Sequence, residues 1–287
     1  MSVKISPAAR EGRWGPFEER GRRWVEAHLG SEAQRALLDE RGLRLWRQWG
    51  LGPRLAEVAA LTPQGLGLVD VGTDHALLPL AVTRSGRSPA ALGVDINEGP
   101  LQGARRRLAP QDRVELALGD GFVGASAQLQ RLWEGLGCPK EGLCGCVCGV
   151  GGAKIASMIP SLPQQLSHLI LQPNLHHGLV RAALYEAGWR LSSERLTLEG
   201  DRLFLTLSAH RAQAEPESSP RVPLIWPERS ELLDDEPWYP LWLWLHLEKE
   251  LALLARAVED SSEEARAHFD QRRAWAHELS ALLSQQL

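Results

Sequence analysis

The sequence predicts an α/β fold: a mostly parallel sheet of seven strands that closes with an antiparallel hairpin, between an N-terminal helical extension and a C-terminal helical domain. Short apolar runs alternate with helical patterns between residues 66 and 187. Such alternation is typical of a parallel sheet with right-handed crossovers. Two longer runs of alternating apolar residues then flank a turn at 199–201 that contains glycine, which indicates a β-hairpin.

The expected elements follow one another at regular spacing. The parallel strands are LGLVDV (66–71), AALGVDI (90–96), VELAL (114–118), LCGCVC (143–148) and HLILQP (168–173). The hairpin consists of WRLSSERLTL (189–198) and RLFLTLSAH (202–210). Helices are expected at 75–84, 100–108 and about 178–187. Nucleotide dehydrogenases more often continue with parallel strands or a second domain, so the closing hairpin argues against that class.

These patterns divide the chain into four parts. Residues 1–50 contain Arg-, Glu-, Leu- and Trp-rich segments punctuated by glycines, which predict an extension of two or three helices. Residues 51–210 hold the sheet. Residues 211–224 are polar and proline-rich, which indicates a linker. Residues 225–287 show broad apolar stripes at helical spacing, which predict a coiled-coil-like helical domain.

Composition indicates a cytoplasmic protein. The 287 residues are 44% hydrophobic, without a run long enough for a membrane span or a signal peptide. All four cysteines lie between Cys138 and Cys148, which suits reduced thiols better than a disulfide framework. The net charge is −4, yet residues 213–287 alone carry 7 basic against 15 acidic side chains, and the rest of the chain is mildly basic. This distribution of charge is compatible with a nucleic-acid partner but does not require one.

Acidic residues and glycines recur where the predicted strands end. The first strand runs into Asp70-Val71-Gly72-Thr73-Asp74-His75, where Gly72 permits a sharp turn and a close approach of the backbone to a ligand. Asp95 ends the second strand, 25 residues after Asp70, at a spacing suited to ribose hydroxyls. The third strand runs into Gly119-Asp120-Gly121, where a carboxylate could accept from an adenine amino group, and the fourth into Cys148-Gly149-Val150-Gly151-Gly152.

Each of these features alone is more often an ordinary turn or helix cap, but their joint occurrence predicts a cofactor that carries a nucleoside. The first turn lacks the full G-x-G-x-x-G of dinucleotide sites. This absence favours S-adenosylmethionine (SAM), which has no phosphate. A parallel sheet with a closing hairpin is also the usual plan of SAM-dependent methyltransferases.

Two other patterns have simpler interpretations. Cys144, Cys146 and Cys148 lie on one face of a predicted strand, whereas structural zinc sites favour C-x₂₋₄-C spacings in turns. We therefore expect small buried side chains and no metal. The run Arg105-Arg106-Arg107 is either a solvated helix face or a phosphate contact.

Six segments in order resemble the TrmK family, the bacterial tRNA adenine-22 N1-methyltransferases. They are GPRLAEVAALTPQG (52–65), VDVGTDHALLPLA (69–81), GVDINEGPLQGA (93–104), LALGDGF (116–122), CGVGG (148–152) and LILQPN (169–174). The strong resemblance covers about 52–209. It implies a Rossmann-like methyltransferase sheet, SAM as cofactor and tRNA as partner. Residues 1–50 resemble no family that we can name.

The resemblance also implies residue roles. Gly72, Asp74 and His75 would lie along the methionine part of SAM, Asp95 would hold the ribose, and Asp120 and Gly121 would face the adenine. The cofactor set is completed by Asp70, Ile96, Asn97, Gly119, Cys148 and Gly149. The target base would meet Gly151, Gly152, Gln172, Pro173 and Asn174. Apart from the resemblance, the arginine run makes Arg105 and Arg106 candidate tRNA contacts.

The expected chemistry is direct attack of adenine N1 on the sulfonium methyl group. The catalytic candidates are Asp74 as acceptor for the cationic product, Asn174 for the exocyclic amine and His75 as an orienting group. The family commonly has a tyrosine at Leu77 and a methionine at Val150. These departures leave two alternatives open: a methyltransferase acting on another RNA, a protein or a small molecule, and a catalytically silent RNA-binding relative. A nicotinamide oxidoreductase is remote, and the oligomeric state is open, with a monomer favoured.

Overall fold

The computed structural model describes residues 3–4, 43–199, 202–211, 242, 270 and 274. The predicted linker lies outside the described residues except Arg211. Almost all of the predicted N-terminal helices and C-terminal helical domain lie outside them as well, so these divisions stay predictions.

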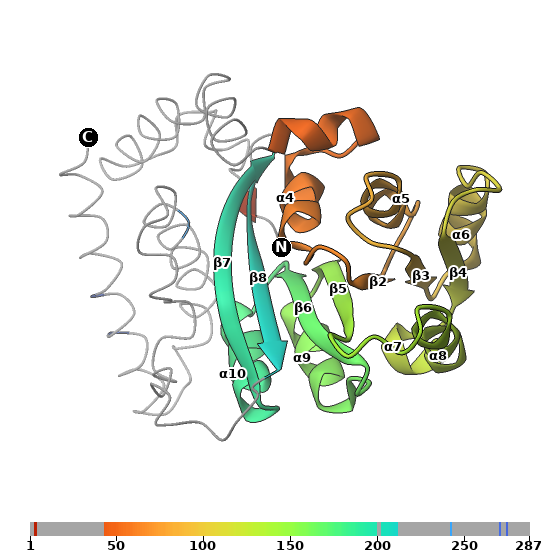
Figure 1. Cartoon of the computed structure of the whole chain (residues 1–287). Coiled ribbons are helices and arrows are strands. Elements are labelled where there is room, and N and C mark those ends of the chain that lie inside the picture. Colours follow the sequence, from red (N-terminus) through yellow and green to blue (C-terminus); the bar gives the residue numbers. More distant parts are fainter. Residues whose placement is uncertain are drawn as a thin grey trace.

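The predicted parallel sheet with its closing hairpin is confirmed (Figure 1). The strands are β2 (Gly67–Val71), β3 (Ala91–Asp95), β4 (Val114–Leu118), β5 (Leu143–Val150), β6 (Leu166–Pro173), β7 (Trp189–Glu199) and β8 (Arg202–Arg211). In space they run β7-β8-β6-β5-β2-β3-β4, with β2 to β6 mutually parallel and β7 and β8 antiparallel. The apolar runs in the sequence account for this result, because strands buried on both faces are nearly continuously hydrophobic.

An eighth, two-residue strand was not predicted. β1 (Val3–Lys4) pairs antiparallel with Leu203 and Arg202 of β8. β6 pairs only with the later part of β8, from Leu207 to His210, which leaves the first part of that edge open. An unpaired strand edge exposes hydrogen-bonding groups, and β1 satisfies some of them.

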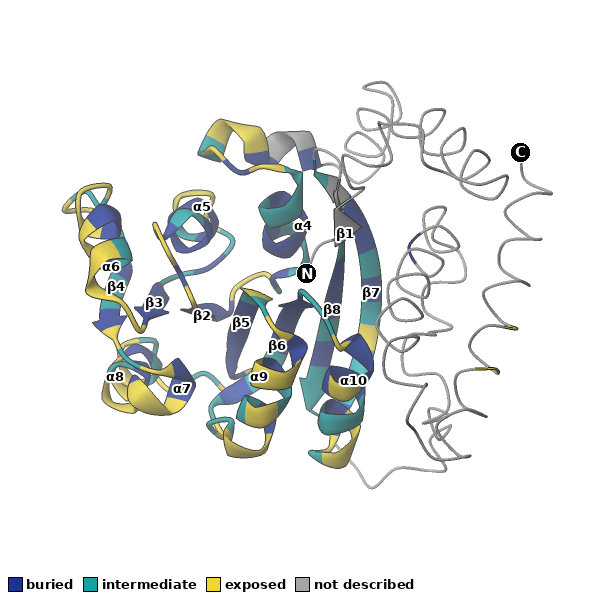
Figure 2. Ribbon diagram, turned by 180° about the vertical axis from the view of Figure 1, so that it is seen from behind, coloured by how far each residue is buried: buried dark blue, intermediate teal, exposed yellow. Residues whose placement is uncertain are grey.

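Helices cover both faces of the sheet. They are the 3₁₀ helices η1 (Leu43–Trp49) and η2 (Ile159–Ser161), and α4 (Pro53–Leu61), α5 (Leu77–Arg84), α6 (Glu98–Arg105), α7 (Gly121–Gly124), α8 (Ser126–Gly135), α9 (Gly152–Met158) and α10 (His177–Glu186). η1, α4 and α5 lie on one face, and α7 to α10 on the other (Figures 1 and 2). α7, α8 and α9 are short or glycine-containing and were not predicted. α5 begins two residues later than expected, because Asp74 and Ala76 have positive φ angles.

Each face of the sheet has its own hydrophobic core. On the α8–α10 face, Val69, Val147 and Leu171 pack with Leu129 of α8 and Ile155 of α9, among others. On the opposite face, β2, β5 and β6 contribute Leu68, Cys144, Cys146 and Ile170, which pack against η1, α4 and α5. The expectation that these cysteines are small buried side chains on one face is therefore met for Cys144 and Cys146. Cys148 is half-buried.

Candidate active site

The candidate site lies at the edge of the sheet where β2 to β5 have their carboxyl ends, here called the carboxyl edge. β3 and β4 lie on one side of β2, and β5 and β6 lie on the other. The chain order reverses between β2 and β5, and open α/β sheets bind ligands outside the carboxyl ends of their strands at such a point. The loops carrying Gly72, Asp95, Asp120 and Gly151 all start from this edge, so the fold brings the four predicted loops together.

The loop after β2 turns immediately and is held against β3. Gly72 has φ +77°, a conformation that glycine adopts without strain, and its amide N–H donates to the carbonyl of Val94 at 2.8 Å. Asp74 and Ala76 also have positive φ, at 51° and 55°. Non-glycine residues adopt this conformation at a cost, and such residues are enriched at functional sites.

Asp70 lies beneath this loop with its carboxyl group buried. Burial raises its pKa from 3.8 to about 6, although the neighbouring Thr73 hydroxyl and Cys146 thiol and the charge of Arg54 oppose the rise. Asp70 is therefore a buried acid with a raised pKa, immediately before the loop that carries Gly72 and Asp74.

Asp95 presents a preorganised carboxylate. Its Oδ2 accepts from the backbone N–H of Asp74 at 3.3 Å, and its Oδ1 accepts from that of Asn97 at 2.9 Å. Each carboxylate oxygen has lone pairs beyond the one used here, so the group can still accept from ligand hydroxyls. The next residue, Ile96, exposes 62% of its surface at this edge. An exposed isoleucine beside a fixed carboxylate suits the apolar face of a nucleoside beside its ribose.

The loop after β4 faces the first turn of α9. The Asp120 carboxylate forms an ion pair with Lys154 of α9, with the ammonium nitrogen 3.2 Å from Oδ1. Both side chains are more than half exposed. Exposed pairs of this kind contribute little stability, so Asp120 can exchange or share this partner with a ligand. Sequence reasoning missed Lys154, because only the fold brings residues 120 and 154 together.

The turns after β5 and β6 are bonded to each other. The Asn174 side-chain amide donates to the carbonyl of Gly149, and its backbone N–H donates to the carbonyl of Val150 at 2.9 Å. The N–H of Gly152 donates to the carbonyl of Leu175 at 3.0 Å. With one N–H used on Gly149, Asn174 retains its Oδ1 acceptor for a ligand.

Gln172 and Pro173 are buried beneath these turns. The Gln172 carbonyl oxygen accepts from Arg54 at 2.8 Å, and its amide donates to Thr206 at 2.8 Å. The side chain of Gln172 thus holds Arg54, which no motif had indicated, against β6 and β8. These two hydrogen bonds of the Gln172 side chain stabilise the region beneath the carboxyl edge.

The remaining predicted residues are placed differently. The His75 ring packs against Gly103 of α6, and its Nε2 lies 3.7 Å from Oδ1 of Asp74. Arg105 and Arg106 lie at the end of α6 remote from the carboxyl edge, because α6 runs back towards the start of β4. The Arg105 side chain, however, reaches back along the helix and pairs with Glu98 in its first turn. The direction of α6 therefore places Arg106 away from the other predicted residues, whereas the Arg105 guanidinium lies on the side of the carboxyl edge. Leu77, where the TrmK family commonly has tyrosine, packs against the core on the α5 face.

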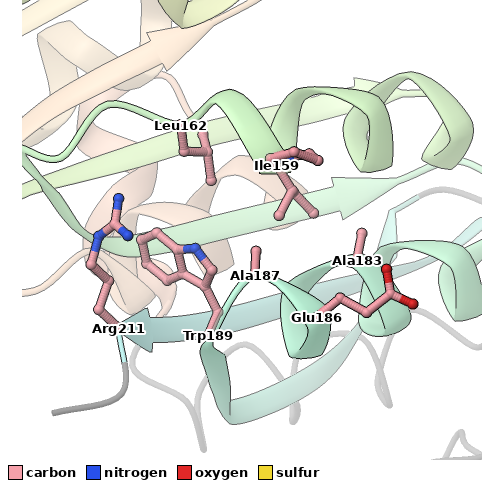
Figure 3. A pocket seen from close by; sticks show the side chains of 8 residues that line it. Ile159, Leu162, Ala183, Glu186, Ala187, Trp189 and Arg211 are labelled. Carbon is pink, nitrogen blue, oxygen red and sulfur yellow. The ribbon is translucent and has the colours of Figure 1, made fainter. Parts of the chain in front are cut away.

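A pocket of about 380 Å³ lies elsewhere, between the ends of α9 and α10 (Figure 3). Arg211 and Trp189 line it, and the guanidinium carbon lies 4.7 Å from the centre of the indole ring. Arg211 also donates to the carbonyls of Leu166 and Pro163, at the start of β6. This pocket is thus at the opposite edge of the sheet from the candidate site, and its arginine already holds the chain together.

Comparison with known proteins assigns the chain to a class. The family profile described as "Methyltransferase domain" matches residues 51–207, which is more than half of the chain, and this protein belongs to that methyltransferase family.

Among individual proteins, the tRNA (adenine(22)-N(1))-methyltransferase of Bacillus subtilis (strain 168) is 29% identical over 165 residues. The alignment covers 55% of this chain and 64% of that protein, so the chain spans slightly less than two thirds of that relative. The resemblance to the TrmK family indicated by the motifs is thereby confirmed.

Solved structures agree on the fold. The B. subtilis M1A22 tRNA methyltransferase TrmK has a TM-score of 0.60 at 22% identity, covering 81% of this chain and 98% of that one. M. capricolum TrmK, in complex with S-adenosyl-homocysteine, has a TM-score of 0.59 at 19% identity, covering 79% and 98%. The Rossmann-like methyltransferase sheet predicted from the sequence is confirmed.

Two features are absent from the described residues. No helix in the described ranges has the length and apolar composition needed to cross a membrane. The same part of the chain contains no cluster of three or more His, Cys, Asp or Glu side chains that could hold a metal ion.

Proposed function

We propose that this protein transfers the methyl group of SAM to N1 of an adenine in tRNA, adenine 22 in the D arm, as a cytoplasmic enzyme. The observation that supports this proposal most directly is the Asp95 carboxylate, held by two backbone N–H groups at the carboxyl end of β3, the neighbour of β2 in a methyltransferase sheet. The B. subtilis relative is named for this reaction, which supports the choice of substrate.

The carboxyl edge fits SAM. A Cβ atom added at Gly149 or Gly151 would meet no atom within 4 Å, so the turn after β5 borders open space. Asp95 would accept from the ribose hydroxyls and Asp120 from the adenine amino group, with Ile96 against the adenine ring. Gly72, Asp74 and His75 would lie along the methionine part. The groups named in these assignments are exposed or have unused hydrogen-bond acceptors, so they are available to bind SAM.

The residues of the chain mainly orient the reactants. When bound, SAM supplies an electrophilic methyl group that adenine N1 attacks in line, without a strong base. Asn174, fixed through Gly149, would accept from the exocyclic amine through its Oδ1 and so direct N1 towards the methyl group. The methylated purine is cationic, and the exposed Asp74 carboxylate would stabilise that charge.

The cofactor half of this proposal is tested by replacing Asp95. Asp95→Ala should abolish measurable SAM binding in titration calorimetry, because the ribose loses its acceptor. Glu115→Ala is a matched control, since that carboxylate lies on β4 and pairs with Arg131 on the surface. Unchanged SAM affinity in Asp95→Ala would remove the cofactor assignment.

The substrate half is tested in cells and in vitro. Reverse transcription should stop at a D-arm adenine of tRNA from the wild type and read through in a deletion strain, with the stop restored by the gene. Asn174→Ala should reduce the rate of transfer to tRNA much more than SAM affinity, and equal losses in both would contradict its placement.

The second candidate function is methylation of a different substrate. Leu77 favours it, because the family tyrosine is replaced here by a side chain packed against the core. SAM binding without any change in tRNA modification would support this alternative.

A further inference from the structure

His176 combines two unusual local features at the carboxyl edge. Its backbone is left-handed, with φ 56° and ψ 46°, which a residue with a Cβ atom adopts at a cost. It also occupies the N-cap position of α10, yet its side chain makes no capping hydrogen bond. Asn, Asp, Ser or Thr normally fill that position, and glycine suits the backbone. Helix capping therefore does not account for a histidine at this position.

The backbone of His176 is fixed against the turn after β5. A Cβ atom added to Gly152 would lie 2.7 Å from the His176 carbonyl oxygen and 2.1 Å from that of Leu175. The same His176 carbonyl accepts from the N–H of Leu179 at 3.1 Å. Because the two turns are in direct contact, the position of the His176 backbone is set by the turn on which the target base is expected to lie.

His176 is exposed, whereas larger aromatic residues at this edge are not. Among the described residues, Tyr185 is the one Phe, Tyr or Trp in the exposed class, and it lies near the far end of α10, 5.5 Å from the Arg190 guanidinium. A base taken out of an RNA stack loses stacking energy, and aromatic side chains, including histidine, replace it. His176 is the exposed planar ring next to Asn174.

We propose that His176 is the stacking platform for the target adenine. This inference rests on the proposed function and adds a residue to it. The backbone of His176 holds this residue beside the turns that carry Asn174 and Gly151, and from there its exposed ring would reach the adenine whose N1 reacts. The strain then persists because the ring in this position serves substrate binding.

The test separates strain from stacking with three variants at one position. His176→Gly removes the ring and relieves the backbone strain, so its melting temperature should equal or exceed that of the wild type. Its KM for tRNA at saturating SAM should rise about tenfold, from the loss of one base–aromatic stack. His176→Ala should show the same rise in KM without the gain in stability. His176→Phe should restore KM to within about threefold of the wild type, because base–aromatic stacking accepts different rings.

A matched control is available at Cys138. This exposed residue also has a positive φ, of 51°, but it precedes β5 at the opposite edge of the sheet. Cys138→Gly should therefore relieve backbone strain in the same way and leave KM for tRNA unchanged. A second readout uses tRNA with 2-aminopurine at the target position. Its fluorescence should be quenched on binding to the wild-type protein and to the His176→Phe variant, and not on binding to the glycine variant.

The outcomes distinguish this inference from the proposed function. A wild-type protein that methylates tRNA, with KM and quenching unchanged in His176→Gly, overturns the stacking role alone. The same holds if phenylalanine restores nothing that alanine loses. A wild-type protein that binds SAM but methylates no tRNA overturns the proposed function and this inference together.

Discussion

Asp70 is a buried carboxyl group whose environment raises its pKa. Because burial raises its pKa from 3.8 to about 6, the folded protein binds a proton that the unfolded chain releases between these two pH values. The stability that the folded state gains by holding this proton is therefore lost as pH rises from about 4 to about 6. Above that range the folded state carries the full cost of a buried, ionised carboxylate. A shift of two units corresponds to an upper bound of about 3 kcal/mol.

Asp70→Asn removes this titration. We expect the variant to be more stable than the wild type at pH 7.5, by about 1–3 kcal/mol, and the difference to disappear towards pH 4. Urea denaturation at both pH values measures it, and other carboxylates cancel in the comparison of the two proteins. Parallel pH profiles for the two proteins would show that Asp70 is not titrating in this range. An asparagine that stabilises the fold but weakens SAM binding would indicate that the buried acid is kept for function.

The sequence could not distinguish glycines of different kinds. Gly151 and Gly152 follow the same strand and read as one turn. Only the structure shows that Gly151 borders open space, whereas a Cβ on Gly152 would collide with the carbonyl of Leu175. The acidic residues at strand ends were predictable, because parallel strands bring their carboxyl ends to one edge. Contacts between remote positions, such as Arg54 with Gln172 or Asp120 with Lys154, were not.

At the scale of elements, apolar runs predicted each of β2 to β8 to within two residues, because a buried parallel strand needs a continuous hydrophobic stretch. Helices were less predictable. α9 has seven residues and begins at a glycine, so its pattern is too short to show helical periodicity. Arg105 and Arg106 were chosen by residue type, and the direction of α6 carries Arg106 away from the carboxyl edge, whereas the Arg105 side chain reaches back to Glu98.

A buried ion pair connects α10 to β7 of the hairpin. The Arg181 Nε and one terminal guanidinium nitrogen lie 2.8 Å from Oε1 of Glu194 on β7, and both side chains are at most 1% exposed. Removing one member of such a pair leaves a charge buried without its partner, which is strongly unfavourable, whereas replacing both by apolar residues is often tolerated.

We therefore expect Arg181→Met to lower the free energy of unfolding by about 3–5 kcal/mol. The double variant Arg181→Met with Glu194→Leu should recover a large part of that loss. Thermal and urea denaturation of the two single variants and the double variant give the coupling energy. Additive effects would mean that the two side chains stabilise α10 and β7 independently.

At the scale of the whole molecule, the methyltransferase core includes a side chain from beyond the sheet. Trp242 lies outside the matched residues 51–207, yet it is fully buried in the core on the α8–α10 face. Its ring meets the ring of His177 edge-on, with 4.9 Å between centroids. His177 follows the proposed stacking residue, so this contact joins the C-terminal part of the chain to the substrate side of the site.

Trp242→Ala should consequently destabilise the sheet domain itself. Removing a buried tryptophan typically costs about 3–5 kcal/mol, because the transfer energy is lost and a cavity remains. Asp270→Ala, at an exposed position of the same region, should stay within about 0.5 kcal/mol of the wild type. Hydrogen exchange locates the effect: amides of α10 and β6 should lose protection in Trp242→Ala. If stability falls while these amides keep their protection, the tryptophan serves the C-terminal region alone, and residues 51–207 form a core that is complete without it.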